Sequence, residues 1–237
     1  MIAVFKREFQ TLFTGPIAYF VWALMFFFAG LFFYSYNILG GQTALTGVFD
    51  ILYTISLMLV VPILTMRAFS EERRNRTDQA LLTAPVSLTG IVMGKYLAML
   101  LVFALGMAIT LVLTVVIAMF GATPAWASIF GNYLGLLLLG GNLIAAGMFF
   151  STLTESQFIS ALLTFAFSFI LLMFDSFASL FSNATWLVTA IEFLSVNTRY
   201  QAFASGTISY GNVIYFLSMQ ALFLFLSVRV LDSRKWQ

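Results

Sequence analysis

The chain has 237 residues, of which 62% are hydrophobic and only 8% are charged, and its net charge is +2. A soluble globular domain carries about 25% charged residues, so this composition excludes one and predicts a protein of the lipid bilayer. The small positive charge bears on membrane orientation and does not indicate nucleic-acid binding. Cysteine and histidine are both absent, which excludes disulfides, thiolate metal sites and histidine-dependent catalysis.

Residues 1–14 are predicted to form an amphipathic helix that lies flat on the membrane. Five apolar side chains share one stripe at 100° per residue, and Lys6 and Arg7 lie outside that stripe. Gly15 and Pro16 then interrupt the pattern. The alternative is that this segment is only the irregular start of the first membrane span.

Six apolar stretches follow, each long enough to cross a hydrocarbon layer of roughly 30 Å. They are residues 17–39, 46–66, 91–120, 129–153, 157–181 and 211–228. The expected fold is therefore an all-α membrane protein with one transmembrane domain over residues 1–237. Pro62 is predicted to kink the second span, and the glycines of the fourth span predict close helix packing.

The basic residues predict the orientation of these spans. Ten of the eleven lie at the N-terminus, between spans two and three, or at the C-terminus, and only Arg199 breaks the pattern. Because Lys and Arg mark the cytoplasmic face, both termini are expected in the cytoplasm.

The stretch 182–210, between spans five and six, is neither short nor very polar. We expect one or two short helices in the outer leaflet there, with a partly buried loop as the alternative. Asp50, Asp175, Glu192 and Arg199 all fall near the outer end of the spans or beyond it. No acid is therefore expected at mid-membrane, which argues against proton coupling.

One sizeable polar insert lies on the predicted cytoplasmic side, at residues 67–78. It carries four arginines, two glutamates and one aspartate, and Pro85 follows shortly after it. This pattern predicts a short, charged helix at the membrane surface over residues 70–85. A solvated loop is the alternative, but acidic residues contribute little to topology, so Glu71 and Glu72 favour a binding role.

This insert resembles the signature of type-2 ABC transporter permeases, and the closest branch is the gliding-motility-type permeases. The residues that carry the resemblance are Met66-Arg67, Glu71-Glu72-Arg73, Leu81-Leu82-Thr83-Ala84-Pro85 and Gly94-Lys95. Weaker matches are Lys6-Arg7-Glu8, Gly15-Pro16-Ile17-Ala18-Tyr19 and Phe203-Ala204-Ser205-Gly206. Arg76 stands where that family usually has glycine, and Gln79-Ala80 replaces a common Glu-Leu, so the docking contacts stay open.

The resemblance implies the transmembrane permease subunit of an ATP-driven exporter in the cytoplasmic (inner) membrane. A second permease copy, identical or related, would complete the translocation path. A separate ATP-binding subunit would bind ATP and Mg, while this chain would hold no cofactor. Residues 70–85 would be the coupling helix, and residues 1–14 would lie beside it. An extracytoplasmic accessory subunit and the transported substrate stay open.

The resemblance also implies roles for individual residues. Those expected to couple to the ATP-binding subunit are Arg67, Glu71, Glu72, Arg73, Arg74 and Asp78. Those expected on the interfacial helix are Lys6, Arg7 and Glu8, and those expected at the outer gate are Glu192 and Arg199.

An ATPase site within this chain is not expected. The segment from Gly90 to Tyr96 is one residue too short for a phosphate loop, and Tyr96 stands where Ser or Thr must reach magnesium. Gly90 and Gly94 instead predict close packing, and Lys95 is predicted to snorkel towards the cytoplasm. The alternatives are an ion-driven carrier, a structural membrane subunit, and a membrane-embedded enzyme, for which catalytic side chains are nearly lacking.

Overall fold

The computed structural model describes residues 1–76, 87–121, 124–180 and 195–234, and within these ranges every regular element is a helix. The helices are α1 (Ile2–Thr14), α2 (Ile17–Phe32), η1 (Phe33–Leu39), α3 (Thr46–Ile55), η2 (Ser56–Val60), α4 (Val61–Thr65), α5 (Ser70–Arg74), α7 (Leu88–Met107), α8 (Ile109–Met119), α9 (Trp126–Leu153), α10 (Gln157–Leu180), α12 (Val196–Ala204) and α13 (Tyr210–Ser233).

Six helical stretches of the described residues are long and apolar enough to cross a membrane, as expected from the sequence. They are Ile17–Leu39, Thr46–Arg74, Leu88–Met119, Trp126–Leu153, Gln157–Phe174 and Tyr210–Ser233. The chain is therefore a multi-pass membrane protein with an all-helical fold.

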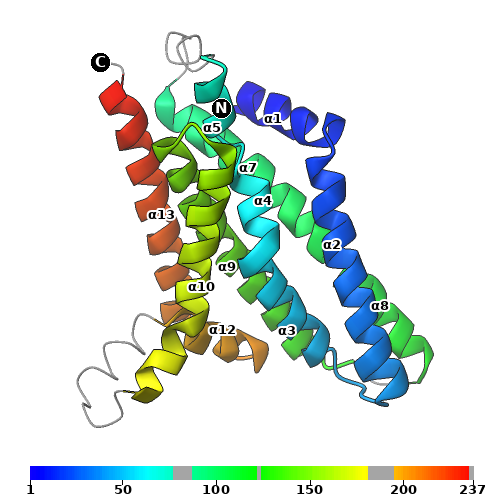
Figure 1. Cartoon of the computed structure of the whole chain (residues 1–237). Helices are drawn as coiled ribbons and strands as arrows, with labels where there is room; N and C mark the ends of the chain where they lie inside the picture. The colour runs from blue at the N-terminus through cyan, green and yellow to red at the C-terminus, as the bar shows by residue number, and fades with distance from the viewer. Residues whose placement is uncertain (77–86, 122–123, 181–194, 235–237) are drawn as a thin grey trace.

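Both termini lie at one end of the bundle, beside α1 and α5, and α12 lies at the other end (Figure 1). We call the first the terminal end and the second the opposite end. α1 runs across the terminal end, whereas α2 runs along the bundle (Figure 1). Phe5, Phe9 and Phe13 of α1 pack against the core, so part of the apolar stripe that was predicted to face lipid covers protein instead.

The glycines of α9 let neighbouring helices approach it closely, which agrees with the close packing predicted for this span. A Cβ atom at Gly131 would collide with the carbonyl oxygen of Phe203 in α12, and one at Gly140 would collide with the ring of Phe103 in α7. The α9 helix contacts α7, α10, α12 and α13. It therefore forms the centre of the bundle, with small residues at its contacts.

The second span is not a uniform α-helix. Five residues, Ser56–Val60, form the π-helical turn η2, and Pro62 follows at the start of α4. Proline lacks the N–H that would bond to the preceding turn, and π turns occur as short interruptions of α-helices. The span is thus interrupted close to the predicted kink, through a wide turn that the sequence analysis did not foresee.

Candidate functional site

Four charged side chains form a compact network at the terminal end, and we call Arg7, Glu8, Glu72 and Lys95 the charge cluster. Lys95 Nζ lies 2.9 Å from Glu72 Oε1 and 3.2 Å from Glu8 Oε1. One Nη atom of Arg7 lies 3.0 Å from Glu8 Oε1 and 3.3 Å from Glu72 Oε1. Two cations thus share two carboxylates, and the cluster joins α1, α5 and α7.

Lys95 is the buried centre of this cluster, with 2% of its side chain exposed. Its ammonium group also donates a hydrogen bond of 2.8 Å to the Ala68 carbonyl oxygen. With Glu8 and Glu72, this contact gives a partner to each of its three donors. The ammonium also lies 5.1 Å from the centre of the Phe69 ring, a cation–π distance. Lys95 was predicted to snorkel towards the cytoplasm; its ammonium group is instead buried, and its charge is satisfied inside the protein.

A close approach of helices brings the cluster together. The position of Gly94 in α7 leaves room for α1, since a Cβ atom there would stand 3.1 Å from the Phe5 backbone nitrogen. Arg7 and Glu8 follow on the next turn of α1, and Lys95 comes directly after Gly94. The packing predicted for Gly94 therefore has a specific partner, which is the N-terminal helix.

A second set of contacts fixes α5 to the turn between α9 and α10. Arg73 Nε lies 2.9 Å from Glu155 Oε1, and an Nη atom of Arg73 donates to the Leu153 carbonyl oxygen at 3.1 Å. The backbone N–H groups of Phe69 and Ser70 donate to Ser151 Oγ at 3.0 and 3.1 Å. Since α5 has only five residues, these contacts, together with Glu72, determine its position.

The other predicted coupling residues lie around α5. Arg67 and Arg74 are exposed, and Glu71 is half-buried in the first turn. Arg76 is exposed and adopts a left-handed φ of 55°, a conformation that glycine adopts without strain. Asp78 lies outside the described residues, as does residue range 77–85 of the predicted coupling helix.

Of the predicted N-terminal residues, Lys6 is exposed on α1, while Arg7 and Glu8 belong to the charge cluster. Neither Ser151 nor Glu155 was predicted to be a site residue. Glu155 does have a signal, because it is the acidic residue of a very short turn that the charge pattern places on the same side as α5. Ser151 has none, since a serine within an apolar helix is common.

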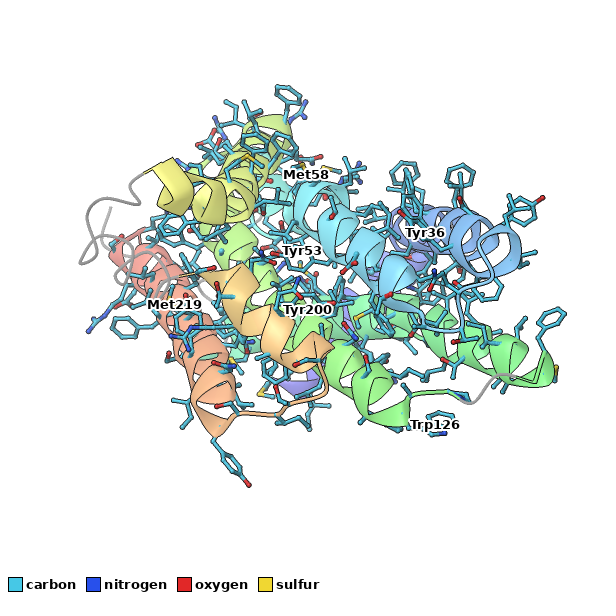
Figure 2. The ribbon with its side chains drawn as sticks, turned by 90° about the horizontal axis from the view of Figure 1, so that it is seen from below. Tyr36, Tyr53, Met58, Trp126, Tyr200 and Met219 are labelled. Atoms are coloured by element: carbon cyan, nitrogen blue, oxygen red, sulfur yellow. The ribbon has the colours of Figure 1, made fainter. Side chains whose placement is uncertain are left out.

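The opposite end holds a polar network around α12. Tyr200 is 1% exposed, its hydroxyl donates to Asn132 Oδ1 at 2.8 Å, and its ring stacks on Tyr53 at 4.7 Å. Figure 2 shows Tyr53 and Tyr200 close together in the view from this end. Burial, and to a lesser extent the nearby Asp50 charge, raises the pKa of Tyr200 well above its usual range. Its hydroxyl therefore stays a donor at physiological pH.

Arg199, predicted at an outer gate, directly precedes Tyr200 in α12. It donates to Asn212 Oδ1 at 3.1 Å and lies 4.0 Å from the centre of the Tyr215 ring in α13. It therefore links α12 to the last span. Glu192 and the side chain of Asp175 lie outside the described residues, as does the range 182–194 of the stretch in which short helices were predicted; α12 is a short helix in the described part of that stretch.

A comparison with protein families supplies one further finding. Residues 5–179 match the model of a family described as ABC-2 family transporter protein. The matched region is well over half of the chain and contains the whole charge cluster, α5 and its contacts with the α9–α10 turn. A comparison with curated proteins found no significant match.

Proposed function

This chain belongs to the ABC-2 transporter family, and from that premise we propose that it is the permease subunit of an ATP-driven exporter. In this proposal a separate ATP-binding subunit holds ATP and Mg and docks at the terminal end. The protein lies in the inner membrane in this proposal, and its terminal end faces the cytoplasm. The basic residues predicted on the cytoplasmic side support this orientation. Two permease copies form the path between them.

The observation that supports this function best is the position of α5. This short helix is attached to α1 and α7 through the charge cluster, and to the α9–α10 turn through Arg73. A rigid-body displacement of α5 by a docked subunit is therefore transmitted to four helices at once.

We assign docking and transmission to different residues. Arg67, Arg74 and Arg76 are exposed and suit charge-guided docking, which determines partner choice and register more than affinity. Glu72 contacts Arg7 and Lys95 of its own chain, so it acts on transmission. The sequence-based expectation gave all the charged residues of the insert one coupling role, whereas this proposal separates docking from transmission.

The test is purification of the tagged chain from its native membrane, identification of its partners by mass spectrometry, and measurement of ATP hydrolysis. We expect a subunit with a phosphate loop. Arg74→Glu should reduce the amount of this subunit that co-purifies. Glu72→Gln should leave co-purification intact and reduce ATPase activity, about tenfold if one charged hydrogen bond is lost.

Asp232→Asn is the matched control, since Asp232 lies at the same end, in α13, and makes no ion pair within the described residues. It should leave both co-purification and hydrolysis unchanged. A chain that is isolated repeatedly without any ATPase would refute the exporter proposal. Equal effects of Glu72→Gln and Asp232→Asn would refute the transmission role alone.

A further inference from the structure

A pocket of about 390 Å³ lies towards the opposite end, between the first and second spans. Phe32 and Tyr36 line it from α2 and η1, while Thr46, Asp50 and Thr54 line it from α3. Its volume falls within the range of about 300–1,000 Å³ that is typical of small-molecule sites. Such sites combine apolar walls with a few polar groups, as this one does.

Asp50 supplies the only formal charge among the residues that line this pocket. In the described part of the chain, its carboxylate makes no hydrogen bond and no ion pair; the Thr54 hydroxyl bonds to the Asp50 backbone carbonyl instead. Ten of the eleven basic residues fall in the three segments that were predicted on the cytoplasmic side. The eleventh, Arg199, bonds to Asn212. Asp50 lies near the outer end of the second membrane span, and the natural partner of its carboxylate is a cation.

Two aromatic rings line the same pocket as this carboxylate. Phe32 and Tyr36 stack with their centres 5.7 Å apart, and Tyr36 lies on the side of η1 that faces α3 (Figure 2). Gly47 of α3 makes room for the ring, because a Cβ atom there would stand 3.1 Å from ring atoms of Tyr36. Aromatic faces carry negative charge density and attract organic cations.

We propose that this pocket binds an organic cation with an apolar body, with the positive charge at Asp50 and the apolar part against Phe32 and Tyr36. A metal ion is a poorer match, since one carboxylate is not a ligand set and the described residues contain no cluster of acidic metal ligands. This inference rests on the proposed function in one respect: if the chain is a permease, such a cation is the class of molecule that it transports.

Binding of tetraphenylphosphonium to the purified full chain, without ATP, tests the site. Tetraphenylborate is the matched probe, because it has nearly the same shape and the opposite charge. Equilibrium dialysis should show saturable binding of the phosphonium and much weaker binding of the borate. Equal binding of the two probes would overturn the proposal, since it would mean that only apolar partitioning occurs.

Substitutions locate the site. Asp50→Asn should weaken phosphonium binding about tenfold or more, and Asp50→Glu should retain most of it. Tyr36→Ala should weaken it roughly fivefold, whereas Tyr34→Ala should not, since Tyr34 is also exposed on η1 but does not line the pocket. Asp50 and Tyr36 are both exposed, so these variants are expected to fold, and unfolding temperatures check this.

The two proposals fail separately. Loss of ATPase co-purification would leave Asp50-dependent binding of the phosphonium standing, because that binding is measured on the chain alone. Phosphonium binding that is unchanged in Asp50→Asn would overturn the cation site, whatever subunit co-purifies.

Discussion

Lys95 shows how a charge can be buried in this protein without remaining unpaired. Its three ammonium donors meet Glu8 of α1, Glu72 of α5 and the carbonyl of Ala68, which lies just before α5. The desolvation of a buried ion is costly, and it is offset only when the partners are complete. Lys95 therefore stabilises one arrangement of α1, α5 and α7 and disfavours others.

Lys95→Met should destabilise the protein by about 3–5 kcal/mol, because two carboxylates then share one arginine in a poorly hydrated position. Thermal unfolding of the purified chain in detergent measures the change. Lys6→Met is the control, since Lys6 is exposed on α1, and should have little effect. Equal unfolding temperatures for the two variants would contradict the assigned role of Lys95.

At the scale of elements, α9 determines how closely the other helices pack. Gly131 meets the backbone of α12 and Gly140 meets a ring of α7, so no side chain fits at those two positions. The first span differs: α2 has much exposed surface, and a Cβ atom at Gly30 would have nothing within 4 Å. Glycine thus has a packing role in α9 that it does not have in α2.

Gly131→Ala should destabilise the protein by about 1–3 kcal/mol, because the added methyl group collides with the Phe203 carbonyl oxygen. Gly30→Ala should be neutral or stabilise by up to about 1 kcal/mol, since alanine favours helix and meets open space. Chemical or thermal unfolding of both variants in the same detergent gives the comparison. A loss of stability in Gly30→Ala equal to that in Gly131→Ala would refute this account of the α9 contacts.

The spans were predictable from sequence, because apolar length is a local property. The charge cluster was not, because it depends on helices far apart in the sequence. Nothing local in Lys95 distinguishes a snorkelling side chain from one that meets Glu8 and Glu72. The turn η2 was missed for a related reason: its five residues are ordinary helix residues, and only packing selects the wider turn.

At the scale of the whole molecule, the two ends differ in chemistry. The terminal end holds the charge cluster and the Arg73–Glu155 pair, whereas the opposite end holds buried tyrosine and asparagine side chains and the Asp50 pocket. This asymmetry matches the proposed roles, with charged docking at one end and recognition of the transported molecule towards the other.

The orientation itself is testable because the chain has no cysteine. Ser209→Cys should react with a membrane-impermeant maleimide in intact cells, whereas Asn75→Cys should react only after permeabilisation, because both positions are exposed and lie at different ends. The unsubstituted chain, which cannot react, is the control. The reverse labelling pattern would place the terminal end outside and exclude docking of a cytoplasmic ATPase there.

The turn η2 has a consequence for how the second span can be altered. A π turn accommodates one more residue than an α-helical turn. The turn Ser56–Val60 therefore places one extra residue between α3 and α4. A one-residue deletion there would give a continuous α-helix and leave Asp50 pointing in the same direction. Conversion of the turn to α-helix without a deletion would rotate α3 by about 100° relative to α4. The direction in which Asp50 faces therefore depends on the number of residues between α3 and α4 as much as on their identity.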